Sequence, residues 1–202
     1  LAERIAEHYG VETRNVLTGF KYIGEQIGLL EKAGEEKRYL FGFEESYGYL
    51  TGTYVRDKDG VDGAVMICEM FSFYAARGIR LTDQLAKLYE RYGYCRNTLH
   101  SYQFEGSAGF AKMQGIMAAF RQGISTFGGK AVEKVLDYSA GLEGLPKADV
   151  LKFYLDGGTT LVVRPSGTEP KLKLYLSVTA KDETEAEQTE QAILNDAEVY
   201  FR

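Results

Sequence analysis

The stretch TTLVVRPSGTEPKLKLYLSV (159–178) decides the fold of the C-terminal half, because it holds two strands and the loop that joins them. Apolar and polar residues alternate in KLKLYLSV (171–178), and the apolar ones are Leu172, Leu174, Leu176 and Val178. This period of two is typical of an antiparallel strand with one buried face. Just before the stretch, Asp156-Gly157-Gly158 predicts a short hairpin turn from LKFYL (151–155).

The residues on either side of this pair of strands predict further strands and two helices. NTLHSYQFE (97–105) and AVEKVLDYS (131–139) are strand candidates. A helix over 107–122 would place Phe110, Met113, Met117 and Phe120 on one face. Asp182, with Glu185 three residues later, resembles a capping box that opens a last helix. Together these elements predict an α+β domain over residues 95–202.

Residues 1–94 show a different pattern, in which helices alternate with strands. Helices are expected over 1–9, 18–34 and 81–93, and over a fourth segment that Asp62 would cap and that ends near residue 78. VETRNV (11–16) and RYLFGF (38–43) are the strand candidates. This order favours an α/β sandwich with a mostly parallel sheet, and we place the domain boundary near Tyr94.

Composition limits the kinds of protein that this chain can be. Its 202 residues are 45% hydrophobic and 26% charged, which is ordinary for a globular protein. The net charge of -5 argues against a nucleic-acid partner, which would select a basic surface. The longest apolar stretch is broken by Glu69, so we expect no contact with a membrane interior. Cys68 and Cys95 form no motif, so a reducing, cytoplasmic compartment is expected. The start at Leu1 suggests a cut from a longer protein.

The loop RPSGTEPK (164–171) has the chemistry of an anion site. Arg164 offers a planar fork of donors that suits a phosphate. Ser166 and Thr168 add hydroxyl donors, and Gly167 lets backbone N–H groups turn inward. The alternative is an ordinary hairpin connection with polar residues.

Two further segments carry candidate binding residues. In FGFEESYGYLTG (41–52), Glu44 and Ser46 follow an apolar strand and could hydrogen-bond the hydroxyls of a sugar, unless the segment is only a solvated loop. In TGFKYIG (18–24), Lys21 could hold a phosphate, or could simply lie on an exposed helix face. RDKDG (56–60) superficially suggests a calcium loop, but Val61 at the fifth ligand position excludes that.

Taken in order, TGFKYIG, EESYG with RDKDG behind it, and RPSGTEPK resemble the α-D-phosphohexomutase family, in its phosphoglucomutase/phosphomannomutase branch. The likeness covers nearly the whole chain and corresponds to the third and fourth domains. It implies a partial three-layer α/β domain over 1–94, lacking its opening strand. It also implies a fourth domain over 95–202 with a fold similar to a TATA-box-binding protein.

The resemblance also implies a reaction and a set of roles. Such enzymes move a phosphoryl group between two hydroxyls of one sugar phosphate, through a phosphoserine and a bisphosphate intermediate, with Mg²⁺ and a glucose 1,6-bisphosphate-type activator. Glu44 and Ser46 would hold sugar hydroxyls, with help from Lys21 and Arg56. The phosphate would be held by Arg164, Ser166, Gly167 and Thr168.

The departures from the family pattern are equally informative. The serine loop and the magnesium loop belong to the first two domains, and neither pattern occurs here. The chain is therefore expected to be inactive without the N-terminal domains of its own polypeptide. Phe43 stands where the family often has Gly, which leaves the sugar open. A phosphopentomutase and a stand-alone phosphosugar-binding module remain the alternatives.

Overall fold

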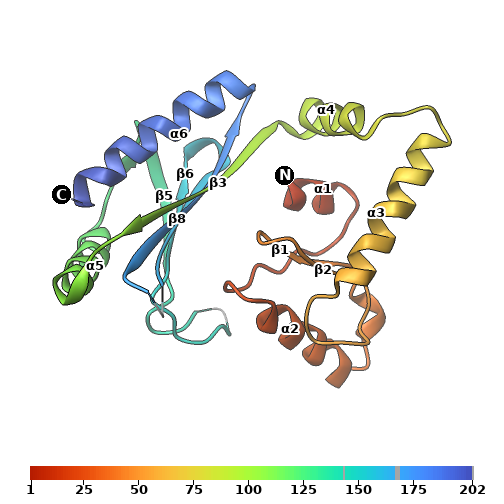
Figure 1. Cartoon of the computed structure of the whole chain (residues 1–202), viewed down its shortest axis with the longest axis horizontal. Helices are drawn as coiled ribbons and strands as arrows, with labels where there is room; N and C mark the ends of the chain where they lie inside the picture. The colour runs from red at the N-terminus through yellow and green to blue at the C-terminus, as the bar shows by residue number, and fades with distance from the viewer. Residues whose placement is uncertain (143, 167–168, 202) are drawn as a thin grey trace. The chain divides into compact units, whose positions relative to one another are not determined.

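The computed structural model describes residues 1–142, 144–166 and 169–201. The chain divides into two compact units (Figure 1). The N-terminal unit is Ala6–Lys87, and the C-terminal unit is Leu1–Ile5 with Leu88–Arg202. Two helices cross this division in sequence, α1 (Ala2–His8) and α4 (Leu81–Tyr92). Both kinds of secondary structure are present, so the predicted mixed α/β class is confirmed.

The C-terminal unit is built on a six-stranded antiparallel sheet with the strand order β3-β8-β7-β6-β5-β4. In chain order the strands are β3 (Tyr94–Gln103), β4 (Thr126–Phe127), β5 (Lys130–Asp137), β6 (Leu151–Leu155), β7 (Thr159–Pro165) and β8 (Lys171–Ala180). The 3₁₀ turn Asp156–Gly158 joins β6 to β7, and both of its glycines have positive φ. The predicted antiparallel sheet is thus confirmed.

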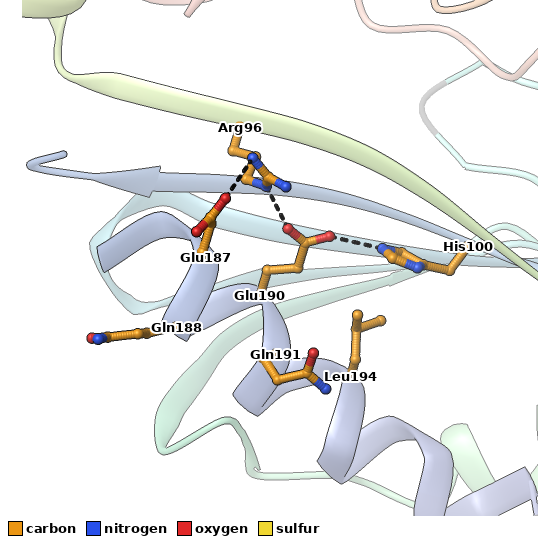
Figure 2. A pocket seen from close by; sticks show the side chains of 7 residues that line it. All are labelled: Arg96, His100, Glu187, Gln188, Glu190, Gln191 and Leu194. Atoms are coloured by element: carbon orange, nitrogen blue, oxygen red, sulfur yellow. Dashed lines mark hydrogen bonds and ion pairs between the residues drawn. The ribbon is translucent and has the colours of Figure 1, made fainter. Parts of the chain in front are cut away.

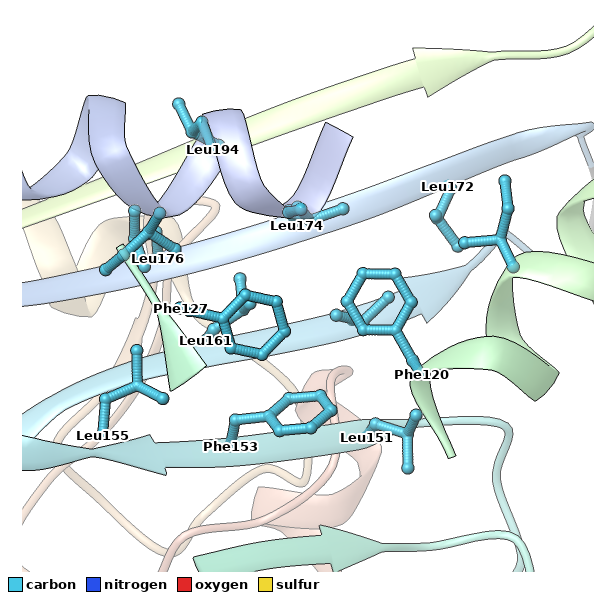
Figure 3. Packing of buried hydrophobic residues seen from close by; sticks show 14 of the residues in the cluster. Phe120, Phe127, Leu151, Phe153, Leu155, Leu161, Leu172, Leu174, Leu176 and Leu194 are labelled. Carbon is cyan, nitrogen blue, oxygen red and sulfur yellow. The ribbon is translucent and has the colours of Figure 1, made fainter. Parts of the chain in front are cut away.

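Two helices, α5 (Gly106–Phe120) and α6 (Glu183–Glu198), pack against one face of this sheet. Figure 3 shows the core between them, where Phe120 from α5 and Leu194 from α6 meet the strands. Phe153 on β6 is fully buried and packs edge-on to Phe127, with ring centroids 5.3 Å apart. The short 3₁₀ helix η3 (Val199–Phe201) extends the same cluster through Phe201.

The strand alternation predicted for 171–178 is confirmed. Leu172, Leu174, Leu176 and Val178 are all 2% exposed or less. The intervening residues lie on the opposite, half-buried side, which we call the outer face of the sheet. On β7 the outer face carries Thr160, Val162 and Arg164.

The two helices of this unit begin as the sequence suggests, with two differences. The Asp182 carboxylate accepts a bond of 2.8 Å from the backbone N–H of Glu185, so the N-cap is confirmed. The Glu185 side chain returns a bond to the N–H of Lys181 and not to that of Asp182. On α5, Met113 and Met117 are buried, but Phe110 is 57% exposed, so its assignment to the core face was wrong.

The N-terminal unit is smaller and mostly helical. It contains α2 (Phe20–Lys32), the 3₁₀ turn η1 (Glu36–Arg38), β1 (Gly42–Glu44), β2 (Gly48–Leu50) and α3 (Gly60–Ala75). The strands β1 and β2 form an antiparallel hairpin. Its core is a small cluster of Phe20, Ile27 and Leu50.

Three predictions for this unit were wrong. Residues 11–16 form no strand, and in residues 6–87, all of which the structure describes, the only sheet is the antiparallel hairpin. The run at 38–43 contributes only its last residues to β1. The N-cap of α3 is Asp59, which accepts from the N–H groups of Val61 and Asp62. Asp62 instead accepts from the N–H and hydroxyl of Thr51, at 2.7 and 2.6 Å.

Helix α3 is apolar on several sides, yet only Gly63 on it is buried. A Cβ added at Gly63 would be in van der Waals contact with the Tyr49 side chain of β2, so α3 passes close to the hairpin here. Exposed apolar residues of α3 include Val65, Ile67 and Phe71. Among the described residues, no helix is both long and apolar enough to cross a membrane.

Substituting Phe153→Ala should destabilise the C-terminal unit by about 3–5 kcal/mol, because it opens a cavity in a fully buried aromatic cluster. Phe110→Ala is the matched control, since Phe110 is mostly exposed, and it should change stability by less than about 0.5 kcal/mol. Urea unfolding followed by circular dichroism measures both. Equal losses of unfolding free energy in Phe153→Ala and Phe110→Ala would contradict the assigned core.

Candidate functional site

The first candidate element is the connection from β7 to β8 in the C-terminal unit. Arg164 lies at the end of β7 and is paired in register with Lys173 of β8. Both side chains belong to the outer face, and both are half-buried. The loop begins with Ser166, whose N–H donates to the carbonyl oxygen of Lys171 at 2.7 Å. The predicted Gly167 and Thr168 lie outside the described residues.

Two cations directly opposite each other on a sheet repel, and such pairs destabilise the strand pairing. Lys152 on β6 adds a third cation on the same face, since it pairs with Val162, two residues before Arg164. Lys171 is neutralised in part by Glu169, with Nζ and Oε2 3.1 Å apart. The outer face therefore concentrates positive charge at the mouth of the loop, which favours an anion there.

Sequence reasoning missed Lys173 as part of this element. Its place on the polar side of β8 follows from the alternation, but its position opposite Arg164 depends on the strand register. The signal that could have found it is the length of the loop. The N–H of Ser166 donates to the carbonyl oxygen of Lys171, so the hairpin closes at these two residues. Counting outward along both strands from there pairs Arg164 with Lys173.

The second candidate element is the hairpin β1–β2 in the N-terminal unit. The Glu44 side chain lies on the buried side of this hairpin, which we call its inner side, and is only 12% exposed. Its Oε1 lies 3.6 Å from Nζ of Lys58, which also contacts Asp57 at 3.3 Å. Asp57 and then Glu44 raise the pKa of Lys58, so this lysine stays charged. Glu44 is thus held in place by a cation that the sequence had not suggested.

Gly48 leaves room for two charged side chains beside this hairpin. A Cβ at Gly48 would lie 2.8 Å from Oε1 of Glu44 and 2.9 Å from Cδ of Lys58. Both side chains therefore pass directly over the Gly48 backbone. The hairpin keeps Glu44 and Lys58 together because no side chain separates them.

The outer side of the hairpin is aromatic. The rings of Phe41 and Phe43 stack with centroids 5.6 Å apart, and Phe41 stacks on Tyr49 at 6.1 Å. Phe41 and Phe43 are each 51% exposed. Phe43, the residue that departs from the family pattern, thus lies on the side opposite Glu44.

The connecting loop Glu45–Tyr47 brings Ser46 and Tyr47 to the tip of the hairpin, where both are exposed. Among the described non-glycine residues, Tyr47 alone has a positive φ, of 61°. Such a conformation costs about 1–3 kcal/mol for a residue with a side chain. The tip is therefore a strained turn with an aromatic side chain that is 85% exposed.

The remaining predicted residues, Lys21 and Arg56, lie on α2 and on the turn before α3. Lys21 is exposed, with Nζ 4.9 Å from the ring centroid of Tyr22. Arg56 donates to Glu31 at 2.7 Å and to the carbonyl oxygen of Thr53. A Cβ at Gly24 of α2 would collide with the Arg56 carbonyl group, so α2 and this turn are in close contact.

The structure thus brings together Glu44 with Lys58, Arg56 with α2, and Arg164 with Lys173. The first two pairs belong to the N-terminal unit and the third to the C-terminal unit. Whether any of them binds a ligand stays a prediction at this point.

A separate hollow of about 480 Å³ lies between β3 and α6 (Figure 2). At its base the Glu190 carboxylate accepts from Nε of Arg96 at 2.6 Å and from Nε2 of His100 at 2.9 Å. Because a carboxylate only accepts, the His100 Nε2 must carry the proton. Arg96 also faces Glu187, at 3.5 Å. Since the Arg96 guanidinium is matched by the Glu187 and Glu190 carboxylates, this hollow has little free charge for a ligand.

Glu190 is 7% exposed, and burial by itself raises its pKa. Hydrogen bonds from Thr98, Arg96 and His100 outweigh that effect, so the pKa lies below its ordinary value of 4.5. Glu190 therefore stabilises the packing of α6 on β3 while it is ionised, and this contribution is lost as the pH falls through the lowered pKa.

Comparison with known proteins places these elements in a family. Residues 1–92 match the family model described as phosphoglucomutase/phosphomannomutase, alpha/beta/alpha domain III. Residues 104–195 match the one described as phosphoglucomutase/phosphomannomutase, C-terminal domain. The chain belongs to the phosphoglucomutase/phosphomannomutase family. The resemblance of the three ordered segments is thereby confirmed.

Similar relatives are named phosphoglucomutase. One from Staphylococcus epidermidis (strain RP62A) is 39% identical over an alignment of 194 positions that covers 88% of this chain and 34% of the relative. One from Staphylococcus saprophyticus is 35% identical over 204 residues, covering 95% of this chain and 37% of the relative. The chain therefore spans about a third of the length of these relatives.

A solved structure gives the same result for the fold. The crystal structure of the exocytosis-sensitive phosphoprotein pp63/parafusin, a phosphoglucomutase from Paramecium in an open form, matches with a TM-score of 0.67. The match covers 98% of this chain and 36% of that one, at 18% sequence identity. At this identity the likeness supports the fold alone.

Replacing Glu190 by Gln should destabilise the C-terminal unit near pH 7 by about 1.5–3 kcal/mol, because charged hydrogen bonds to Arg96 and His100 are lost. The gap in unfolding free energy between wild type and variant should shrink as the pH falls through the lowered pKa of Glu190, where native wild type loses the charge as well. Urea unfolding from pH 3 to 7 measures the gap. Glu187→Gln is the control, since Glu187 is 57% exposed and should contribute little. A gap that does not vary with pH would contradict the role of the Glu190 charge.

Proposed function

We propose that this chain forms domains III and IV of a sugar-phosphate mutase of the phosphoglucomutase type, with domain III over residues 1–94 and domain IV over 95–202. The observation that carries the proposal is the pair of cations, Arg164 and Lys173, facing each other at the mouth of the RPSGTEPK loop. The names of the relatives support the reaction class. The enzyme would transfer a phosphoryl group within a sugar phosphate, through a phosphoserine and a bisphosphate intermediate.

In this proposal the two units have different tasks. The loop after β7 binds a phosphate through the guanidinium of Arg164, the hydroxyl of Ser166 and the charge of Lys173. The first two were predicted from sequence, together with Gly167 and Thr168, and the register adds the third. An anion there removes the repulsion between the two cations, so binding also stabilises the strand pairing.

The hairpin β1–β2 binds hydroxyl groups of the sugar. Glu44 accepts from a hydroxyl, and the contact with Lys58 fixes the direction of its carboxylate. Ser46 at the tip can donate and accept. Lys21 and Arg56 are the further substrate-binding candidates of this unit. Arg56 already has partners in Glu31 and Thr53, so its proposed role includes holding α2 against the turn.

The phosphoserine and the magnesium ion of the reaction are assigned to domains outside this chain. By resemblance the family uses Mg²⁺ and a bisphosphate activator. In residues 1–142, 144–166 and 169–201 there is no group of three or more His, Cys, Asp or Glu placed to hold a metal ion. We assign no residue of this chain to Mg²⁺. A reducing, cytoplasmic location is proposed because Cys68 and Cys95 form no motif.

The sugar is the part of the proposal with alternatives. A phosphomannomutase or phosphopentomutase would use the same phosphate loop, because that loop recognises charge and not the ring. A stand-alone phosphosugar-binding module would keep both binding elements without turnover. A substrate panel on the intact protein separates these cases.

The isolated chain should bind inorganic phosphate weakly, near the millimolar level, about -4 kcal/mol, because the loop is exposed to water. Arg164→Ala should remove most of this affinity, and Lys173→Ala should weaken it less, because Lys173 is a point charge and not a planar fork. An NMR titration measures both. Lys112→Ala, an exposed lysine on α5, is the control and should bind as wild type. If Arg164→Ala binds phosphate normally, the phosphate assignment is wrong.

The isolated chain should also show no mutase turnover, since the proposed phosphoserine belongs to other domains. The assay is incubation with glucose 1-phosphate, Mg²⁺ and glucose 1,6-bisphosphate, followed by detection of glucose 6-phosphate. Sustained turnover by the pure chain would overturn the division of tasks proposed here.

A further inference from the structure

We infer that Tyr47, at the tip of the β1–β2 hairpin, is a substrate-positioning residue whose ring stacks on the sugar of the sugar phosphate. This inference rests on the proposed function and deepens it. Sequence reasoning singled out Glu44 and Ser46 in this segment and left Tyr47 aside. The conformation and exposure of Tyr47 point to it independently of those two residues.

The backbone conformation at position 47 follows from the hairpin geometry. The closing pair of the hairpin is Glu44 with Gly48, so Glu45, Ser46 and Tyr47 form the loop. A loop of three residues commonly ends with a residue in the left-handed region, where glycine is the least strained choice. The chain has Tyr at this position, with φ of 61°.

Gly48, the glycine next to Tyr47, does not relieve this strain, because two other side chains occupy the space beside it. Gly48 is one residue later, and the side chains of Glu44 and Lys58 occupy the space that its Cβ would need. Gly48 thus leaves room for these two side chains, and the turn would be less strained with a glycine at 47. The fold of the hairpin gives no reason for a tyrosine at position 47.

Packing does not explain the tyrosine. Its side chain is 85% exposed, more than that of any other large hydrophobic residue described as exposed. A strained residue persists when its side chain has a function, and such residues cluster at binding sites. The inference therefore runs from an observed outlier to a contact with something outside the described chain.

The chemistry of the neighbours indicates what that contact is. Glu45 and Ser46, which precede Tyr47 in the loop, are exposed groups that can hydrogen-bond hydroxyls. A sugar ring has an apolar C–H face as well as hydroxyls. A tyrosine has an apolar ring and a polar tip, so it matches both kinds of surface with little loss of conformational freedom. A hexose or pentose ring fits this tip better than a purely apolar or purely ionic ligand.

The test is a set of substitutions in the 202-residue chain, each titrated with glucose 1-phosphate, followed at the backbone amides of residues 44–50, and with inorganic phosphate, followed at the amides around Arg164. Tyr47→Gly and Tyr47→Asn both relieve the strain, so both should unfold at the same or a higher temperature than wild type. Both should bind glucose 1-phosphate about 2- to 10-fold more weakly, the range expected for one aromatic contact. Their affinity for inorganic phosphate should not change.

Two controls separate the ring from other effects. Tyr47→Phe keeps the ring and the strain, and should bind glucose 1-phosphate within about twofold of wild type. Tyr9→Ser removes another exposed tyrosine of the same unit, 69% exposed, and should leave both affinities unchanged.

The inference is wrong if Tyr47→Gly binds glucose 1-phosphate as wild type does, or if it loses affinity for inorganic phosphate to the same extent. It is also wrong if wild-type amides of residues 44–50 do not respond to glucose 1-phosphate while those around Arg164 respond to phosphate. That last result leaves the proposed phosphate loop standing. If neither probe shifts either region, the proposed function fails, and this inference fails with it.

Discussion

The register between β7 and β8 is the constraint on which the C-terminal unit depends. Leu161 pairs with Leu176 and Val163 with Leu174, and all four side chains are buried under α5 and α6. Because side chains alternate along a strand, the same register places the next residue of each strand on the outer face. A slip by one residue would expose the leucines and bury the lysines, at a cost of many kcal/mol. The core thus fixes where the charges of the loop must lie.

The same argument explains which parts of this unit could be predicted from sequence. The alternation in 171–178, the turn at Asp156–Gly158 and the cap at Asp182 are local patterns, and local patterns were enough to find them. The contribution of Lys173 needs the strand pairing, which is a relation between two segments. Phe110 shows the limit of helical spacing. It is three residues before Met113, but the buried face of α5 runs through Gly109, Met113 and Met117, so Phe110 lies beside that face and not on it.

The N-terminal unit was harder to predict because its contacts are less periodic. VETRNV has residues that favour strands, but β-propensity depends on a partner strand, and no strand in residues 6–87 pairs with it. The contacts that do hold the unit together pass over glycines, at Gly24 against Arg56 and at Gly48 under Glu44 and Lys58. From sequence a glycine is interpreted as a turn or a helix end. Helix α3 is apolar enough to suggest burial, yet the two-stranded hairpin of this unit covers only its start.

The two proposed binding elements differ in what they could distinguish, and this difference bears on the specificity of the proposed function. In the proposed function Arg164 and Lys173 recognise charge, and every sugar phosphate carries the same charged group above a pKa of about 6. Charge therefore contributes affinity without selecting a ring. Selection must come from groups with direction and shape, which in this chain means the Glu44 carboxylate that Lys58 fixes and the exposed side chains at the hairpin tip. A carboxylate set in a rigid turn rejects a misplaced hydroxyl, because it would then lose water without gaining a hydrogen bond. The strained turn at 45–47 agrees with a role in selection. A loop that must hold its side chains in one geometry for binding cannot also adopt its least strained backbone conformation.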